Sequence, residues 1–116
     1  MIPSGNDVRV YLATGVTDMR KSMNTLSILV AQRMDLNPLS GHLFGFCNRK
    51  RDTLKILYWD RNGFCLWHKR LERDRFRWPQ NDAEVQMIGS RELRWLLDGL
   101  SIQQSAHGAL EYSSIC

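Results

Sequence analysis

The sequence predicts an α+β fold, in which an antiparallel β-meander sheet carries one long N-terminal helix on one face and a short C-terminal helix. Between Gly41 and Pro79 the apolar runs are short, rich in β-branched and aromatic residues, and separated by turn residues, a pattern typical of successive strands. Outside this stretch, apolar residues recur at three- and four-residue steps, as in amphipathic helices. The length of 116 residues fits a single domain with one core.

The chain is expected to divide into a flexible lead over residues 1–7, one α+β domain over 8–100, and a polar tail over 101–116 that frays. No apolar run approaches the roughly 18 residues that a membrane helix needs, and the N-terminus lacks the pattern of a secretory signal. The 3 cysteines form no CxxC motif, and their odd number argues against a disulfide framework. These features predict a cytoplasmic protein without a membrane partner.

The N-terminal part is expected to contain a short strand over residues 8–12, followed by a break near Gly15. Thr17 is a suitable N-cap, and the carboxylate of Asp18 suits the positive end of a helix dipole. These signals predict a helix over residues 18–35. Its expected apolar face consists of Met19, Met23, Leu26, Val30 and Met34.

The meander is expected to contain strands at residues 42–48, 53–60 and 64–71, and residues 75–78 are expected to add a fourth before Pro79 ends it. A charged turn over residues 48–52 joins the first two strands. A tight turn joins the next two, because Asn62 and Gly63 tolerate the positive φ that hairpin turns require.

The strand register in this hairpin depends on the length of the loop. A two-residue Asn62-Gly63 loop pairs Tyr58 with Trp67 and Leu54 with Leu71. A three-residue loop ending in a glycine bulge slips the register by one residue and places Leu54 opposite Arg70. We expect the first register, because it buries more apolar surface and a slip of one residue turns a whole strand over.

The C-terminal part is expected to hold a short strand over residues 84–88 and then a helix, with Ser90 as its N-cap, Glu92 in its first turn and Gly99 as its stop. The apolar face of this helix consists of Leu93, Leu96, Leu97 and Leu100. The single core is expected to include Met23, Leu26, Ile56, Leu57 and Leu66.

Charge is concentrated in the meander. The whole chain has a formal net charge of +4, whereas residues 41–79 hold ten of the 16 lysines and arginines and only four of the 12 carboxylates. The stretch also holds eight of the eleven aromatic residues. Such clustering exceeds what solubility requires and indicates a polyanionic partner, of which nucleic acid is the leading candidate.

The candidate phosphate-binding residues are Arg49, Lys50, Arg51, Lys69, Arg70, Arg73, Arg75 and Arg77. Strand alternation directs Lys69 and Arg70 to opposite faces. In an extended segment Arg75 and Arg77 project together, while Phe76 and Trp78 face the core. The strongest prediction is therefore Arg75 and Arg77 with the turn at 49–51. The alternative is a solvated basic edge that protects the sheet against edge pairing.

A phosphate-binding loop fits the sequence poorly. Residues 15–22 resemble one, but Arg20 stands where a second glycine is needed for the backbone to curl round a phosphate. A helix start carrying Arg20 and Lys21 remains a candidate for holding a nucleic-acid phosphate.

Metal and nuclease sites also fit poorly. The potential zinc ligands are His42, Cys47, Cys65 and His68. Their odd spacings within strands point each pair to opposite faces, whereas a tetrahedral site needs convergence. The carboxylates at Asp18, Asp60, Glu72 and Asp74 show no spacing that would gather them around shared ions. We therefore predict no catalytic residue, no metal and no cofactor.

Several blocks together resemble one known family. They are Arg9-Val-Tyr-Leu-Ala-Thr-Gly-Val-Thr-Asp-Met-Arg-Lys21, Gly41-His-Leu-Phe44, Leu54-Lys-Ile-Leu57, Trp59-Asp60, and Lys69-Arg-Leu-Glu-Arg73 with Phe76 and Trp78-Pro79. In this order they resemble the small accessory protein, often called TnpB or second open reading frame product, of bacterial insertion sequences of the sixty-six type. The resemblance covers about residues 8–100. The ending after Ser101 differs from the family's usual Arg- and Trp-containing ending.

The resemblance implies a non-catalytic role in transposition, beside a separate and larger transposase. Two functions of different class follow as hypotheses. The protein contacts DNA at the element ends through its basic face, or it is an adaptor that docks on the transposase without touching DNA. One continuous basic surface favours the first hypothesis, and an exposed apolar patch favours the second.

Overall fold

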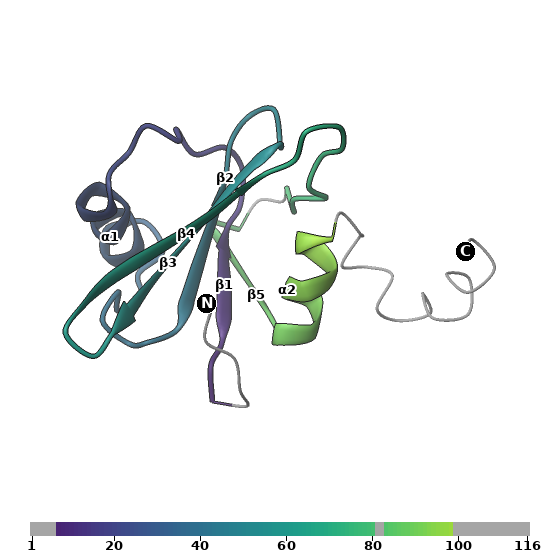
Figure 1. Ribbon diagram of the computed structural model, residues 1–116. Helices are drawn as coiled ribbons and strands as arrows, with labels where there is room; N and C mark the ends of the chain where they lie inside the picture. The colour runs from purple at the N-terminus through teal and green to yellow at the C-terminus, as the bar shows by residue number, and fades with distance from the viewer. Residues whose placement is uncertain (1–6, 81–82, 99–116) are drawn as a thin grey trace.

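The computed structural model describes residues 7–80 and 83–98 of the protein (Figure 1). Its elements in chain order are β1 (Val10–Ala13), α1 (Met23–Gln32), β2 (Leu43–Cys47), β3 (Thr53–Asp60), β4 (Gly63–Arg70), β5 (Val85–Ile88) and α2 (Ser90–Leu97). The strands form one five-stranded sheet in the order β4-β3-β2-β1-β5. Figure 1 shows α1 and α2 on opposite sides of this sheet. Neither helix is long and apolar enough to cross a membrane.

The sheet is mixed, so the predicted antiparallel meander describes only part of it. β2, β3 and β4 are antiparallel neighbours, as predicted. β1 pairs with β2 in parallel, with Val10 opposite Leu43 and Leu12 opposite Gly45. The reason is the connection, because the segment containing α1 returns the chain to the end of the sheet from which β1 started. β5 then pairs antiparallel with the other side of β1.

The predicted long N-terminal helix over residues 18–35 is wrong at both ends. α1 has only 10 residues, and its N-cap is Ser22, whose Oγ accepts a hydrogen bond from the backbone nitrogen of Thr25. The predicted cap Thr17 is buried, and its backbone nitrogen donates to the carbonyl oxygen of Cys47. The stretch from Thr17 to Lys21 is therefore used to attach the chain to the sheet. At the other end, the chain leaves the helix before Asp35, which has a φ of 55°.

The β3–β4 hairpin has a two-residue loop, but the loop is Arg61-Asn62, one position earlier than predicted. Asp60 consequently pairs with Gly63, and Leu54 lies opposite Lys69 where Leu71 was predicted. The offset is two residues, so every side chain keeps its predicted face. Arg61, with a φ of 56°, occupies the left-handed conformation that was expected of Asn62 and Gly63.

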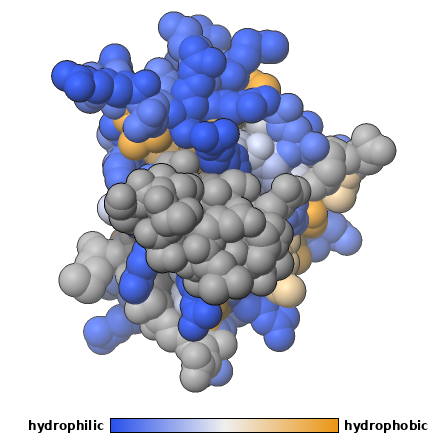
Figure 2. Space-filling view, turned by 90° about the vertical axis from the view of Figure 1, so that its right-hand side faces the viewer, coloured by the Kyte–Doolittle hydropathy of each residue, from blue (hydrophilic) through white to orange (hydrophobic). Residues whose placement is uncertain are grey.

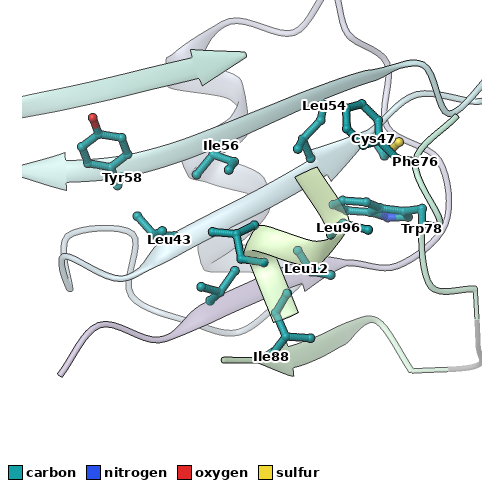
Figure 3. Close-up of a cluster of buried hydrophobic side chains, with 12 residues drawn as sticks. Leu12, Leu43, Cys47, Leu54, Ile56, Tyr58, Phe76, Trp78, Ile88 and Leu96 are labelled. Atoms are coloured by element: carbon teal, nitrogen blue, oxygen red, sulfur yellow. The ribbon is translucent and has the colours of Figure 1, made fainter. Parts of the chain in front are cut away.

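The core consists of two clusters, one on each face of the sheet, where a single core was predicted. Leu26 and Val30 of α1 pack with Phe44, Phe46 and Leu57 on one face. On the other face, α2 and the segment after β4 cover a second cluster, shown in Figure 3. Its buried members include Leu12, Leu54, Ile56, Phe76, Trp78, Ile88 and Leu96. Consecutive strand residues alternate between the clusters, because side chains of a strand point alternately to the two faces.

The predicted core residues differ in burial. Leu26, Ile56 and Leu57 are fully buried, and Leu66 is partly buried against the α1 cluster. Met23 is 40% exposed, so its prediction as a core residue is wrong. It lies in the first turn of α1, which is where the helix actually begins, and not one turn inside a longer helix.

The predicted fourth strand at residues 75–78 does not form, although the predicted alternation does. Phe76 and Trp78 are buried, and Arg75 and Arg77 are exposed. The predicted strand at 84–88 is confirmed as β5, and α2 confirms the short C-terminal helix, although its N-cap is Gly89 and not the predicted Ser90. The predicted stop Gly99, Leu100 and the tail over 101–116 lie outside the described residues, as does most of the lead.

Candidate nucleic-acid interface

The β2–β3 turn is built around the side chain of Asn48. Its Oδ1 accepts hydrogen bonds from the backbone nitrogens of Asp52 and Thr53, each over 3.1 Å, and its Nδ2 donates to Asp52 Oδ1 over 2.8 Å. The backbone nitrogen of Arg51 also donates to the carbonyl oxygen of Asn48. The turn closes with Arg51 in the left-handed region, at a φ of 62°. It is therefore a fixed support for the side chains at positions 49–51, rather than a loose loop.

The segment after β4 is held against this turn. The backbone nitrogen of Phe76 donates to the carbonyl oxygen of Arg51 over 2.6 Å, and the Phe76 ring is buried in the α2-side cluster. Trp78 is buried beside it, and its Nε1 donates to the carbonyl oxygen of Ala13 over 2.9 Å. Gly45 makes room for the indole, because a Cβ at that position would lie 3.2 Å from Trp78 Cη2. Two buried aromatic rings thus anchor a segment whose alternate residues are arginines.

Together the two segments form an open hollow of about 970 Å³. It is lined by Arg49, Lys50, Arg51, Arg73, Asp74, Arg75, Phe76, Arg77 and Asp98. In Figure 1 the β2–β3 turn and the segment after β4 lie side by side at one end of the sheet, and Figure 2 shows that the surface at this end is mainly hydrophilic. We call this feature the basic hollow. It brings together six of the predicted phosphate-binding residues, including the five of the strongest prediction.

The positive charge of the basic hollow is only partly compensated. In the described ranges the ion pairs are Arg20–Asp18, Arg33–Glu84 and Arg70–Glu72, so none of the hollow's six cations has an ion-pair partner there. Two carboxylates, Asp74 and Asp98, line the hollow without reaching ion-pair distance. The nearby Asp52 carboxylate accepts a hydrogen bond from the Asn48 side chain within the turn, and this bond lowers the pKa of Asp52.

The other four predicted residues lie elsewhere. Lys69 points to the α2 side of the sheet, where its Nζ donates to the carbonyl oxygen of Leu97 over 3.0 Å. Arg70 is 3.8 Å from Glu72. Arg20 donates through Nε and Nη2 to the carboxylate of Asp18. This side-chain hydrogen bond is the largest cause that lowers the pKa of Asp18 to about 2, so the charge of Arg20 is locally neutralised. Lys21, which precedes the N-cap of α1, is half-buried and does not line the hollow.

The hollow offers little for stacking bases. Phe76 and Trp78 are the aromatic residues within its two segments, and both rings are buried. Base stacking requires an exposed ring face. The arrangement therefore suits contact with phosphates, which cations recognise without reading the bases.

The described residues contain no group of three or more His, Cys, Asp or Glu placed to hold a metal. Cys47 is fully buried, and burial raises the pKa of its thiol to about 12. Such a thiol is a poor nucleophile at neutral pH. His42 uses its Nδ1 to accept a hydrogen bond from the backbone nitrogen of Arg9.

Sequence reasoning missed the contribution of α2. Asp98, which directly follows the helix, lines the basic hollow, and Ser90, Arg91, Arg94 and Trp95 line a second hollow of about 470 Å³. The signal for the second set was present, because positions 91, 94 and 95 share one face of a helix. No local signal places Asp98 beside residues 49–51, since their proximity depends on how α2 docks on the sheet.

Comparison with known proteins agrees with the resemblance noted in the sequence. Residues 8–107 match the family described as IS66 Orf2 like protein, so the match continues past Ser101 into the ending that looked atypical. The chain is 44% identical over 100 residues to an uncharacterized protein, y4hO, of Sinorhizobium fredii (strain NBRC 101917 / NGR234), covering 86% of this chain and 87% of that protein. It is 32% identical to a second uncharacterized protein of the same strain, y4jC, over 86% of each chain. No solved structure matches. The protein therefore belongs to the IS66 Orf2 like family, a family of insertion-sequence accessory proteins.

Proposed function

We propose that the protein contacts DNA during transposition by holding backbone phosphates in the basic hollow, as a non-catalytic partner of a separate transposase. The observation that carries this proposal is the joining of two basic segments, at 49–51 and 73–77, by the hydrogen bond from Phe76 to Arg51. Side chains from both segments line one open surface, where they can reach the same nucleic-acid backbone.

The electrostatics support a polyanionic ligand. Six cations and two carboxylates line the hollow, and the cations lack ion-pair partners in the described part of the chain. A protein that brings lysines and arginines to DNA phosphates releases condensed counterions, and this release drives binding at low salt. With the adjoining aromatic rings buried, recognition at this site depends on the backbone, and sequence preference within the transposition complex is left to other components.

The decisive experiment measures DNA affinity as a function of salt for the wild-type protein and for a double variant, Arg75→Ala with Arg77→Ala. The DNA is a duplex carrying an end of an insertion sequence of this type, and an unrelated duplex of equal length. Each lost phosphate contact should lower the slope of log affinity against log salt by about one unit. We expect a reduction of about two units for the double variant, equal for both duplexes.

A charge-matched control is available at the opposite end of the sheet. Arg9 precedes β1 and Arg61 lies in the β3–β4 loop, and both are exposed. Arg9→Ala with Arg61→Asn removes the same charge, and asparagine suits the positive φ of position 61. This control should keep the wild-type slope. A folded Arg75/Arg77 double variant with an unchanged slope, or a wild-type protein that binds neither duplex at low salt, contradicts the proposal and leaves docking on the transposase as the function.

A further inference from the structure

The two edges of the sheet differ in length. β5 forms one edge with 4 residues, and β4 forms the other with 8 residues, which is longer than a typical strand. Within the described ranges no backbone group pairs with the outer side of β4. A long unpaired edge is a template for another strand, and proteins usually protect it.

The ladder with β3 determines which groups of β4 point outward. The backbone nitrogen of Leu71 donates to the carbonyl oxygen of Asp52 over 2.8 Å. The odd-numbered residues of this strand therefore direct their backbone N–H and C=O groups toward β3. In an antiparallel strand, alternate residues direct both their N–H and their C=O to the same side. The outward residues are therefore Phe64, Leu66, His68 and Arg70.

The usual protections of an edge strand are missing from most of β4. The pairing with β3 runs without a bulge from Thr53 and Arg70 to Asp60 and Gly63. Residues 63–67 contain no proline and no charge. The ammonium of Lys69, which could have guarded the edge, is bound to the carbonyl oxygen of Leu97.

Apolar side chains along this edge are incompletely covered on both faces of the sheet. Phe64 and Leu66 lie on the α1 face, and Cys65 and Trp67 lie on the α2 face. All four are half-buried. The partners of Cys65, Leu66 and Trp67 on β3 are buried, whereas Trp59, the partner of Phe64, is half-buried as well. A neighbouring strand at this edge would complete their burial.

We infer that β4 is a dimerisation edge, where a second copy of this chain adds its own β4 antiparallel across a two-fold axis perpendicular to the sheet. This axis keeps each face on its own side, so outward residues pair with outward residues. In the register that pairs all four outward residues, Leu66 lies opposite His68 and Phe64 lies opposite Arg70. Trp67 of one copy then lies beside Trp67 of the other on the axis.

Charge favours an antiparallel arrangement of the two copies over a parallel one. The cations of β4 are confined to its C-terminal end, at Lys69 and Arg70. The antiparallel register places Arg70 opposite the Phe64 ring, which suits a cation–π contact, and keeps the two basic ends apart. The two basic hollows would then lie at opposite ends of one ten-stranded sheet. The dimer itself requires no DNA.

The first test is the molar mass of the DNA-free protein in solution, measured by light scattering during gel filtration. We expect twice 13.5 kDa for the wild type and 13.5 kDa for Leu66→Pro. Proline at position 66 removes an outward N–H and leaves the ladder with β3 intact, as edge strands tolerate. Circular dichroism verifies that this variant is folded.

The matched control is Met87→Pro on β5. The backbone nitrogen of Thr14 donates to the carbonyl oxygen of Glu84, so the even-numbered residues of β5 face β1 and the N–H of Met87 points outward. This variant places the same substitution on the other edge and should remain dimeric. A monomeric wild type, or a Leu66→Pro protein that folds and stays dimeric, overturns the inference.

Cross-linking tests the register. Trp67→Cys, made with Cys65→Ser and Cys116→Ser, should form an intermolecular disulfide under mild oxidation, because a non-hydrogen-bonded antiparallel pair brings the two Cα atoms within disulfide range. The native Cys65 alone, with Cys116→Ser, lies opposite Lys69 and should not cross-link. A cross-link through Cys65 and none through position 67 contradicts the proposed pairing.

Discussion

The backbone nitrogen of Phe76 donates to the carbonyl oxygen of Arg51 over 2.6 Å, and this bond connects two segments that are 25 residues apart in the chain. Phe76 is buried, and Arg51 occupies a left-handed turn position that Asn48 stabilises. The positions of the cations in the basic hollow therefore depend in part on groups that carry no charge, namely the Phe76 ring, the backbone and the Asn48 side chain. Changes to those groups should weaken DNA binding without altering the net charge.

Asn48→Ala is expected to destabilise the protein and to weaken DNA binding. The substitution removes an acceptor for the backbone nitrogens of Asp52 and Thr53, and such partly buried donors cost about 1–3 kcal/mol when they lose their partner. Urea unfolding measures the first effect and the salt titration the second. Asn62→Ala, in the other hairpin loop, serves as the control and should change both by little. Equal behaviour of the two variants would show that the Asn48 side chain does not organise the turn.

Asp98→Asn is expected to raise DNA affinity and to leave the fold unchanged. Asp98 is exposed and lines the basic hollow, where its charge opposes an approaching phosphate. The gain should be largest at low salt and should shrink as salt screens the interaction. Asp35→Asn removes the same charge from the end of the α1 segment, at a φ of 55° that asparagine accepts. If both substitutions raise affinity equally, net charge and not the hollow governs binding.

The two segments of the basic hollow could be predicted because each is a short, continuous stretch of the sequence. The turn at 49–51 and the alternation of Arg75 and Arg77 with two aromatic residues follow from strand chemistry, even though 75–78 is not a strand. The parallel pairing of β1 could not be predicted in the same way, because it depends on a crossover connection. The start of α1 was misplaced because Thr17 and Ser22 are both acceptable caps, and the attachment of Thr17 to Cys47 decides between them.

Leu57→Ala is expected to lower the free energy of unfolding by about 2–5 kcal/mol, since Leu57 is fully buried in the α1-side cluster. Met23→Ala is the matched control, because the sequence placed both residues in the core and the structure leaves Met23 exposed. Chemical denaturation of both variants gives the comparison. A large loss of stability for Met23→Ala would mean that α1 begins earlier than residue 23.

Gly45→Ala is expected to destabilise the protein and to displace the arginine segment. A Cβ at this position of β2 would lie 2.8 Å from Leu12 Cδ2 and 3.2 Å from Trp78 Cη2, so Leu12 must shift and the indole must give way by about a few tenths of an ångström. Overpacking of this kind costs about 1–3 kcal/mol. Because Trp78 anchors the segment that carries Arg75 and Arg77, DNA affinity should fall more than for Leu57→Ala at equal folded fraction. Tryptophan fluorescence and the salt titration check the two parts.

Cys47 is expected to resist thiol reagents in the folded protein. Burial raises the pKa of its thiol from 9.0 to about 12, against a smaller opposing effect of the Asn48 backbone hydrogen bond. A group that holds its proton more tightly when folded contributes stability that is complete below the unfolded pKa and is lost as pH rises through the folded one. The stability difference between the wild type and Cys47→Ser should therefore narrow between about pH 9 and pH 12.

In a Cys116→Ser protein at pH 8, a disulfide reagent should label the half-buried Cys65 first and reach Cys47 only after denaturant is added. Rapid labelling of both thiols in the folded protein would show that β2 is not sealed beneath α2 and the Phe76 ring.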